Sequence, residues 1–392
     1  MENDVFELIR QKCPSGVRMD KIKNVARIYR GVRVVKENLF EAGYPVYQNS
    51  VVPMGYMDEP NRSANTVFLI CAGAAGDIGF SREAMWAADD CYCFKSDVLD
   101  QRFLYYCLVS QAERIKSFVR DGAIPRFAAS SVGNLLIPLP PFEIQREIVA
   151  ILDKFDAYCN SMTAGLAGEL EMRRKQYRYW RDKIFQDLLD EGCGMKTIGE
   201  LGAFERGSGL DKSMLQDSGD IPVIHYGQIY TTYNLKIDRT VSFLDAGTAV
   251  SVSARHGDVV VCLTETANLG FVGKAVAQIC GVDVAISNDA GVLRLDSNEM
   301  NNVFLSYYME TGRFQAKKEM CKRGTTVMHL DIKSWQKIPV PVPDMARQRE
   351  IVCILDKFRE LERELERELE LRKKQYAYYR DMLLSFPEQK GA

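Results

Sequence analysis

Two stretches of the chain carry apolar residues at steps of three and four, from Ile148 to Leu188 and from Ile351 to Leu383. This spacing puts the apolar side chains on one face of an α-helix and is typical of a coiled-coil seam. Prolines stand before both stretches, where they end the preceding strand and start a new element. The pattern predicts two long helices, each of roughly 40 residues and about 60 Å.

Helices of this length extend beyond what a small domain covers, so we expect the two seams to cover each other. An antiparallel direction follows from the internal repeat of the chain. The predicted seam residues are Ile148, Leu152, Phe155, Cys159, Met162, Leu166, Leu170, Tyr177, Trp180, Ile184 and Leu188, and Ile351, Leu355, Phe358, Leu361, Leu365, Leu369, Tyr376, Tyr379 and Leu383.

The internal repeat includes both helical stretches. Residues 137–155 recur as residues 340–358, and both copies contain Gln-Arg-Glu-Ile-Val followed by Leu-Asp-Lys-Phe. Residues 173–182 recur as residues 372–381 around a shared Lys-Gln-Tyr. A repeat constrains the architecture before any secondary structure is assigned. This one predicts a circular arrangement with a pseudo-two-fold axis.

Two variable regions accompany the repeated segments and mix short β-branched runs with turns. Predicted strands include 66–70 and 258–261, and the predicted helical segments are 102–119 and 302–321. The fold class is therefore α+β, with two globular α+β domains separated by the two long antiparallel coiled-coil helices. The predicted parts are an N-terminal helical segment at 1–16, globular domains at 17–137 and 195–340, and helical spacers at 138–194 and 341–392.

The two helices differ in length by four residues. Gln145 and Gln176 lie 31 positions apart, whereas Gln348 and Gln375 lie 27 apart, and the extra turn falls in the near-repeat Thr163 to Leu170. Four residues add one helical turn and about 6 Å, which keeps the seam nearly in phase. Such a turn is what a length ruler needs, although simple length drift in a coiled coil is an alternative.

Composition indicates a folded protein rather than a disordered one, because 46% of the 392 residues are hydrophobic and 27% are charged. The eleven cysteines lack a framework spacing, which favours reduced thiols and a cytoplasmic location over disulfides. The N-terminus is acidic and the sequence has no long apolar run, so we expect no signal peptide and no membrane span.

The charge balance limits what the chain binds alone. Its net charge is −2, and the two globular regions are near neutral, with 15 basic against 13 acidic residues in 17–137 and 15 against 16 in 195–340. A protein that grips phosphates usually has a positive excess. We therefore expect any DNA binding by the isolated chain to be weak, with a partner supplying part of the phosphate contacts.

Three pairs of polar segments are candidates for DNA contact. Cationic and hydroxyl side chains suit phosphate positioning and base-edge reading, and amide side chains pair with adenine. An ordinary surface role is the alternative for each residue. The candidates in the first region are Arg30, Arg33, Lys36, Gln48, Asn49, Arg120 and Arg126, and in the second Arg206, Lys212, His225, Tyr226, Gln228, Lys322, Arg323, Thr325, Thr326 and His329.

Basic and polar residues of the repeated helices are candidates for partner contact. A run of basic residues is usually a solvated helix face, and its recurrence at equivalent places leaves a partner or phosphate contact open. The candidates are Gln145, Arg146, Arg173, Arg174 and Lys175, and Gln348, Arg349, Arg372, Lys373 and Lys374.

Catalytic motifs are missing from the sequence. It has no phosphate-binding Walker motif, and its three histidines are too dispersed to pair with a nucleophile. The spacing of Cys91 and Cys93 is not that of a zinc knuckle. We therefore expect a protein that is not an enzyme and has no cofactor of its own.

With these motifs in view, the chain resembles a specificity subunit of a type I restriction-modification system. The resemblance is strongest in the two Gln-Arg-Glu-Ile-Val…Leu-Asp-Lys-Phe segments and the two Lys-Gln-Tyr segments. In the variable regions it is only architectural.

The resemblance implies that each globular region is a target-recognition domain and reads one half of a bipartite, asymmetric double-stranded DNA site. It also implies that the helices set the spacing and dock two methyltransferase subunits, which use S-adenosylmethionine, and that restriction subunits can join. The alternative from another class is a coiled-coil interaction scaffold with two globular protein-binding domains.

Overall fold

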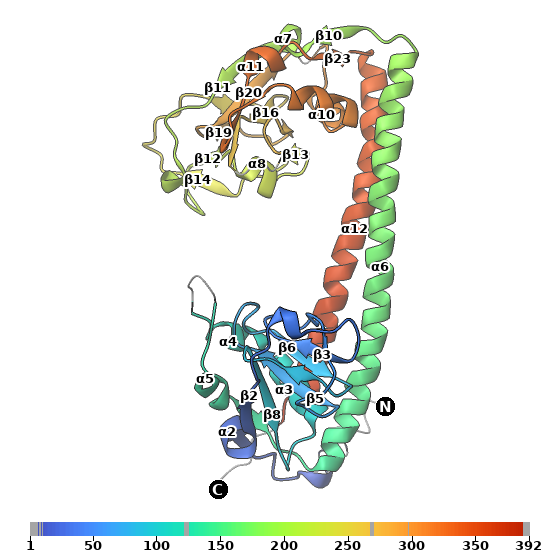
Figure 1. Ribbon diagram of the computed structural model, residues 1–392. Helices are drawn as coiled ribbons and strands as arrows, with labels where there is room; N and C mark the ends of the chain where they lie inside the picture. Colours follow the sequence, from blue (N-terminus) through green and yellow to red (C-terminus); the bar gives the residue numbers. More distant parts are fainter. Residues whose placement is uncertain are drawn as a thin grey trace. The chain divides into compact units, whose positions relative to one another are not determined.

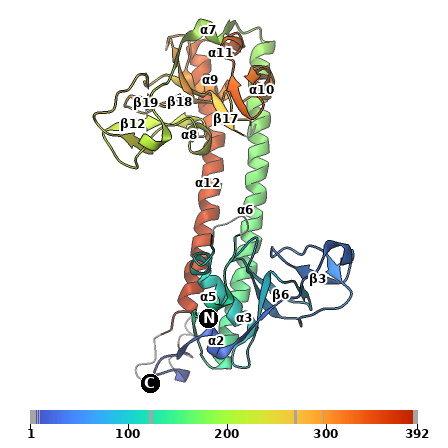
Figure 2. The ribbon, with the colours of Figure 1, turned by 60° about the vertical axis from the view of Figure 1, so that its left-hand side comes forward.

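The computed structural model describes residues 7 and 9 and residues 11–120, 125–266, 270–296 and 298–386. The chain forms two compact units, one made of Met1–Ala167 with Arg367–Ala392 and the other of Gly168–Glu366. Each unit contains one globular α+β part and a section of both long helices (Figures 1 and 2). All eleven cysteines are free thiols.

The two predicted long helices are confirmed as α6 (Phe142–Asp190, 49 residues) and α12 (Met345–Leu383, 39 residues). Within each unit they run side by side in opposite directions. In the first unit the ring of Phe155 lies 5.7 Å from that of Tyr379. In the second, Arg174 pairs with Glu366, and the Arg359 guanidinium lies 4.2 Å from the centroid of the Tyr177 ring. Residue numbers in contact therefore rise along α6 while they fall along α12, as in an antiparallel pair.

The predicted seam needs two corrections. Trp180 and Leu361 are exposed, whereas their neighbours Arg181 and Glu362 face inward. Both charged side chains have ionic partners, as buried charges require. Arg181 lies 3.6 Å from Glu310, which also accepts a hydrogen bond from Arg359 at 2.8 Å, and Glu362 lies 3.4 Å from Arg359. A one-residue shift of the inward face around this ionic cluster puts the larger apolar side chains outside.

The seams also cover each other less completely than predicted, because the terminal turns of the helices pack into the globular cores. Ile148, Leu152 and Leu383 belong to the core of the first unit. Phe185, Leu188, Ile351 and Leu355 belong to the core of the second.

The globular part of the first unit contains two sheets and a two-stranded ribbon, in the orders β2-β8-β5-β6, β4-β3-β7 and β1-β9. Helix α3 packs on β5 and β6. The elements are β1 (Met19–Lys21), α2 (Ile22–Val25), β2 (Arg27–Arg30), η1 (Lys36–Asn38), β3 (Tyr44–Tyr47), β4 (Tyr56–Met57), β5 (Thr66–Ile70), β6 (Ile78–Ser81), β7 (Trp86–Ala87), β8 (Cys91–Lys95), α3 (Gln101–Ser110), α4 (Ala112–Lys116), α5 (Ala129–Gly133) and β9 (Leu136–Pro138).

The globular part of the second unit repeats this plan, with sheets β11-β20-β16-β18-β13 and β14-β12-β19-β15, a third sheet β17-β22-β21 and the ribbon β10-β23. Its elements are β10 (Met195–Thr197), α7 (Ile198–Leu201), β11 (Gly202–Arg206), η2 (Lys212–Met214), β12 (Ile221–Ile224), α8 (Gln228–Thr231), β13 (Lys236–Ile237), β14 (Ser242–Leu244), β15 (Ser253–Ala254), β16 (Val259–Cys262), β17 (Thr264–Thr266), β18 (Ala275–Gln278), β19 (Val284–Ile286), β20 (Ala290–Leu295), α9 (Asn302–Met309), α10 (Gly312–Glu319), β21 (Lys322–Arg323), β22 (Val327–Leu330), α11 (Ile332–Trp335) and β23 (Pro339–Pro341).

The α+β class is thus confirmed, as are the strands predicted at 66–70 and, shifted by one residue, at 258–261. Each predicted domain helix is instead two helices, α3 with α4 and α9 with α10. In the second unit the break is set by Thr311, whose side chain accepts a hydrogen bond from the Phe314 amide and caps a new helix.

The repeated glutamine motif attaches each long helix to its own globular part. The Gln348 side chain donates to the carbonyls of Glu299 and Pro343 at 2.8 Å and accepts from the Asn301 amide at 2.8 Å. Asn301 is the N-cap of α9, so the glutamine holds the start of the domain helix against the start of α12.

Gln145 repeats this arrangement in the first unit, with the carbonyls of Val98 and Pro140 and the amide of Asp100. The two glutamines are 1% and 0% exposed. This corrects the prediction that they contact a partner, because their polar groups are used inside the chain.

The aspartates of the same motif add a second attachment. Asp153 accepts a hydrogen bond from the Tyr106 hydroxyl at 2.6 Å, and Asp356 accepts one from Tyr307 at 2.6 Å. Arg102 pairs with Asp153, and Lys236 pairs with Asp356. The motif therefore positions a domain on each helix.

Replacing Gln348 by alanine should leave one amide and two carbonyls of the attachment without partners. A buried polar group left unpaired costs about 1–3 kcal/mol, so we expect Gln348→Ala to lose at least about 2 kcal/mol of unfolding free energy. Urea denaturation followed by tryptophan fluorescence measures this loss. Arg349→Ala, at the exposed neighbouring position, is the control, and equal losses in both variants would contradict the assignment.

Candidate nucleic-acid interface

Equivalent loops meet at one end of the central sheet in each unit. Backbone hydrogen bonds show which residues correspond. The N–H of Gly31 donates to the Cys91 carbonyl, and that of Gly207 donates to the Ala290 carbonyl. In the same way, the N–H of Phe127 donates to the Cys71 carbonyl, and that of Leu330 donates to the Leu263 carbonyl. We call this region the loop edge. It consists of Arg30, Gln48, Asn49 and Arg126 in the first unit and of Arg206, His225, Tyr226 and His329 in the second, in corresponding order.

A close backbone approach fixes each loop edge. A Cβ atom on Gly31 would lie 2.0 Å from the Ala88 carbonyl oxygen, and one on Gly207 would lie 2.3 Å from that of Ser287. Only glycine fits at such distances. The adjoining Arg30 and Arg206 are therefore held beside the turns that lead into β8 and β20.

The second loop edge is connected by polar side chains. Arg206 lies 3.3 Å from Oδ1 of Asp289, which also accepts a hydrogen bond from the Thr264 hydroxyl at 2.9 Å. The hydroxyl oxygen of Thr264 lies 3.1 Å from Nδ1 of His329. The structure thus brings together Arg206 and His329, which are far apart in the sequence and were predicted in separate segments.

His225 and Tyr226 extend this edge as an aromatic row. Their rings lie 4.4 Å apart, Tyr226 is followed by Tyr230 at 6.4 Å, and Tyr230 stacks on Phe271 at 4.7 Å. The Gly227 amide donates to Nδ1 of His225. Partial burial lowers the pKa of His225 below its usual 6.5, and the charge of Lys212 adds to the effect.

The first loop edge keeps the arginine, Arg30, and uses different side chains at the other three corresponding places. Nε of Arg30 donates to the Asp89 carbonyl at 2.6 Å, and the amide of Arg120 donates to the carbonyl of Arg126 at 2.9 Å. Arg126 and Asn49 are exposed. Residues 121–124 of the predicted loop lie outside the described residues. Arg33 and Lys36 are exposed on the segment that follows Gly31.

Two predicted contact residues are corrected by their surroundings. The Lys322 side chain is 6% exposed and pairs with Glu319 at 2.8 Å and Glu265 at 3.8 Å. The side-chain oxygen of Gln228 accepts a hydrogen bond from the backbone N–H of His225, and its side-chain nitrogen donates one to the Ser242 hydroxyl. Both side chains are therefore engaged inside the unit.

Three other predicted residues, Arg323, Thr325 and Thr326, are exposed around the turn at Gly324, and Arg323 pairs with Asp331. Sequence reasoning missed Thr264, Asp289, Tyr230 and Phe271. The sequence pattern gave no local signal for these four, because only the sheet brings them to the edge.

The basic residues predicted to contact a partner lie on exposed helix faces. Four of them form ion pairs within their own helix, four residues apart: Arg173 with Glu169, Lys175 with Glu171, Arg372 with Glu368 and Lys374 with Glu370. Arg174 pairs with Glu366 across the helices. Arg146, Arg349 and Lys373 are exposed.

Exposed apolar side chains recur at equivalent places on the two helices. Met172 corresponds to Leu371, and Tyr179, 61% exposed, corresponds to Tyr378, 66% exposed. Large apolar side chains in solvent at repeated positions are typical of a protein contact surface.

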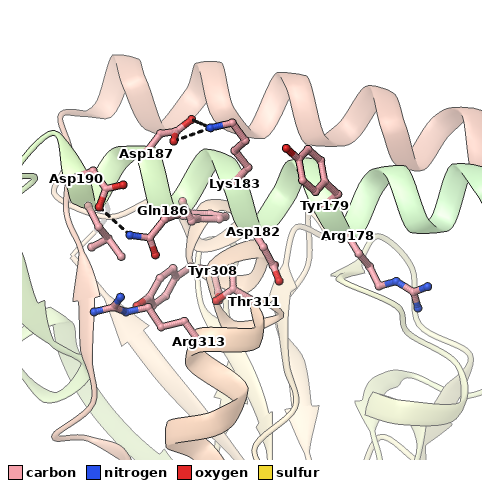
Figure 3. A pocket seen from close by; sticks show the side chains of 12 residues that line it. Arg178, Tyr179, Asp182, Lys183, Gln186, Asp187, Asp190, Tyr308, Thr311 and Arg313 are labelled. Carbon is pink, nitrogen blue, oxygen red and sulfur yellow. Dashed lines mark hydrogen bonds and ion pairs between the residues drawn. The ribbon is translucent and has the colours of Figure 1, made fainter.

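Beside Tyr179 runs a groove of about 690 Å³ between α6 and the α9–α10 junction. Figure 3 shows Tyr308 and Arg313 facing the row of Asp182, Gln186 and Asp190 on α6. The sequence pattern did not single out this groove. Among the described residues, no helix has both the length and the apolar character to cross a membrane.

Comparison with known proteins gives one consistent family. The family model for the type I restriction modification DNA specificity domain matches residues 4–172 and 191–371. The chain is 31% identical over 303 residues to the EcoR124I/EcoR124II type I restriction enzyme specificity subunit of Escherichia coli, covering 73% of this chain and 71% of that one. It is 25% identical over 386 residues to a putative type I restriction enzyme specificity subunit of Haemophilus influenzae, covering 94% of both.

Solved structures agree on the fold. A chain from a structure of type I R-M complex assembly and conformational transition has a TM-score of 0.61 at 17% identity, covering 94% of this chain and 97% of that one. The type I restriction-modification S subunit from M. genitalium has a TM-score of 0.51 at 19% identity, covering 94% and 96%.

Acidification should weaken the second unit through His225. Its pKa is lower in the folded than in the unfolded protein, so the unfolded state takes up the proton first, and stability is lost as the pH falls from 6.5 through the folded value. We expect His225→Gln, which introduces the residue found at the equivalent position 48, to reduce the loss of melting temperature between pH 7 and pH 5. Thermal unfolding across this range measures it. His256→Gln, at an exposed histidine, is the control, and an unaltered acid response in His225→Gln would contradict the prediction.

Proposed function

Because the chain belongs to the type I restriction modification DNA specificity family, we propose that its two globular parts read the two halves of a bipartite, asymmetric site in double-stranded DNA. The observation that carries this proposal is the loop edge, which is built twice on the same backbone with different side chains. A protein that binds one ligand twice has no need of unlike residues at equivalent positions.

The two loop edges support recognition of different bases. Arginine pairs with guanine, amides pair with adenine, and aromatic side chains contact base edges and sugars. The first edge offers Arg30, Asn49 and Arg126, whereas the second offers Arg206, Tyr226 and His329 at the same places. Different side chains at equivalent backbone positions favour recognition of two half-sites with different base sequences.

The long helices support docking of two partner subunits, which we propose are methyltransferase subunits that use S-adenosylmethionine. The paired exposed residues Met172 with Leu371 and Tyr179 with Tyr378 give each helix the same apolar patch. Two equivalent patches suit two copies of one partner, and Arg146 and Arg349 add equivalent exposed cations. The groove of Figure 3 adjoins one of these patches.

In this proposal the chain itself is not catalytic. It supplies sequence recognition and spacing to a complex that methylates adenine and, where restriction subunits join, cleaves DNA. Such a complex works in the cytoplasm, where the DNA lies.

Loss of this chain should remove adenine methylation at one bipartite motif and leave other motifs unchanged. The physical reason is that a methyltransferase without its reading domains has no contacts to select that site. Single-molecule sequencing of the methylated genome in mutant and parent measures this. An unchanged methylation pattern in a strain with active methyltransferase subunits would support the protein-scaffold alternative instead.

Shortening α6 by one turn should alter the spacing and not the half-sites. Outside their chain neighbours and nearby helix backbone, Gly165 and Gly168 have no heavy atom within 4 Å of their Cβ positions. None of the residues Thr163–Leu166 belongs to a globular core, so the turn is removable without disturbing one. Its loss shortens the helix by about 6 Å, no more than about two base-pair steps. Methylome sequencing of the deletion strain measures the new gap. Replacing the same four residues by alanines keeps the length and is the control, and altered half-site sequences would contradict the ruler role.

A further inference from the structure

A cationic pocket of about 350 Å³ lies in the second unit between α6, α12 and the segment 270–274. Six of its lining side chains are basic and only Glu310 and Glu362 are acidic. The basic residues are Arg174, Arg178, Arg181, Lys274, Lys318 and Arg359. This excess contrasts with the overall charge of −2 and with the near-neutral domain.

Several of these cations are held away from water without a full set of partners. The Lys318 side chain is 1% exposed, and its ammonium donates to the Gly270 carbonyl at 3.0 Å. Lys274 donates to the Tyr233 carbonyl at 2.8 Å. Nε of Arg359 has no hydrogen-bond partner among the described residues. Because an ammonium has three N–H groups, both lysines retain donors for a further acceptor.

The rim of the pocket is open to a ligand. Arg178 is exposed and forms no ion pair with any described residue. Burial lowers the pKa of Lys318 to about 8, and the charge of Glu319, whose carboxylate lies 3.9 Å away, offsets this effect only in part. An anion with several acceptor oxygens would offset this cost.

We propose that this pocket binds a phosphate group of the DNA backbone next to the half-site read by the second unit. The proposal rests on the proposed function, and continuity with the loop edge supports it. Phe271 lines the pocket and stacks on Tyr230, the next ring after Tyr226 in the aromatic row. A strand whose bases lie at His225 and Tyr226 would pass along this row to the pocket.

The first unit carries less positive charge at the equivalent positions, although Arg174 and Arg181 correspond to the basic Lys373 and Arg380. Backbone hydrogen bonds align Lys274 with Asp77, since their carbonyls accept from Cys262 and Ile70. The helix repeat aligns Arg359 with Asp156, and Arg178 with Ala377. We therefore expect this phosphate contact beside the second half-site and not beside the first.

Arg178→Ala is the variant that tests the proposal, because α12 already carries alanine at the equivalent position and the fold tolerates it. Binding of the full chain, assembled with its methyltransferase subunits, to the methylated site is measured over a series of salt concentrations. We expect a three- to tenfold loss of affinity, and a fall of about one in the slope of log affinity against log salt. Lys357→Ala removes an exposed cation of the same unit outside the pocket and should change neither. Ethylation of single phosphates should interfere beside the second half-site with the unaltered chain, and Arg178→Ala should lose the interference at one of these phosphates while keeping it beside the first half-site.

An unchanged salt slope in Arg178→Ala, or an ethylation interference pattern that is the same in the variant as in the unaltered chain, would overturn the proposal. Inorganic phosphate, tested by its effect on the melting temperature of the isolated full chain, distinguishes the other source of this ligand. If Arg178→Ala abolishes stabilisation by phosphate and leaves DNA binding intact, the pocket binds a free anion. The methylated sequence reports separately on the proposed function, because loss of a backbone contact leaves the bases that are read unchanged.

Discussion

Each long helix is attached to its globular part by a buried glutamine, and the arrangement of each unit depends on that contact. Gln145 and Gln348 satisfy groups at the start of α3 and α9 that would otherwise be buried without partners. The cost of leaving such groups unpaired makes the attachment directional, since only one placement of the helices satisfies all of them. Asp153 and Asp356, two turns further on, fix the rotation of the helix.

The sequence was sufficient to predict the two helices, the α+β class and the internal repeat, because apolar periodicity and self-similarity are regular over long stretches. It was harder to predict which side chains of each long helix face inward. Arg181 faces inward instead of Trp180, and a one-residue shift of this kind depends on an ionic partner, Glu310 at the C-terminal end of α9, that periodicity does not contain. The glutamines looked like partner contacts because a polar residue at a helix start gives no sign of burial.

At the loop edge, sequence reasoning found one member of each contact and missed the other. Arg206 and His329 were candidates, whereas Asp289 and Thr264, which connect them, come from different strands of the folded sheet. Lys322 and Gln228 have partners inside the unit, which the sequence pattern did not reveal. Composition showed near-neutral domains but not the local cationic pocket, which draws its charge from α6 and α12 as well as from the globular part.

The glycines at positions 31 and 207 separate what is fixed at the loop edge from what is free to vary. Their backbones lie against carbonyl oxygens, so any side chain there would force the strands apart. The neighbouring Arg30 and Arg206 are exposed. If the loop edge reads DNA as proposed, its specificity should be changeable by replacing the exposed side chains while both glycines and the sheet are kept.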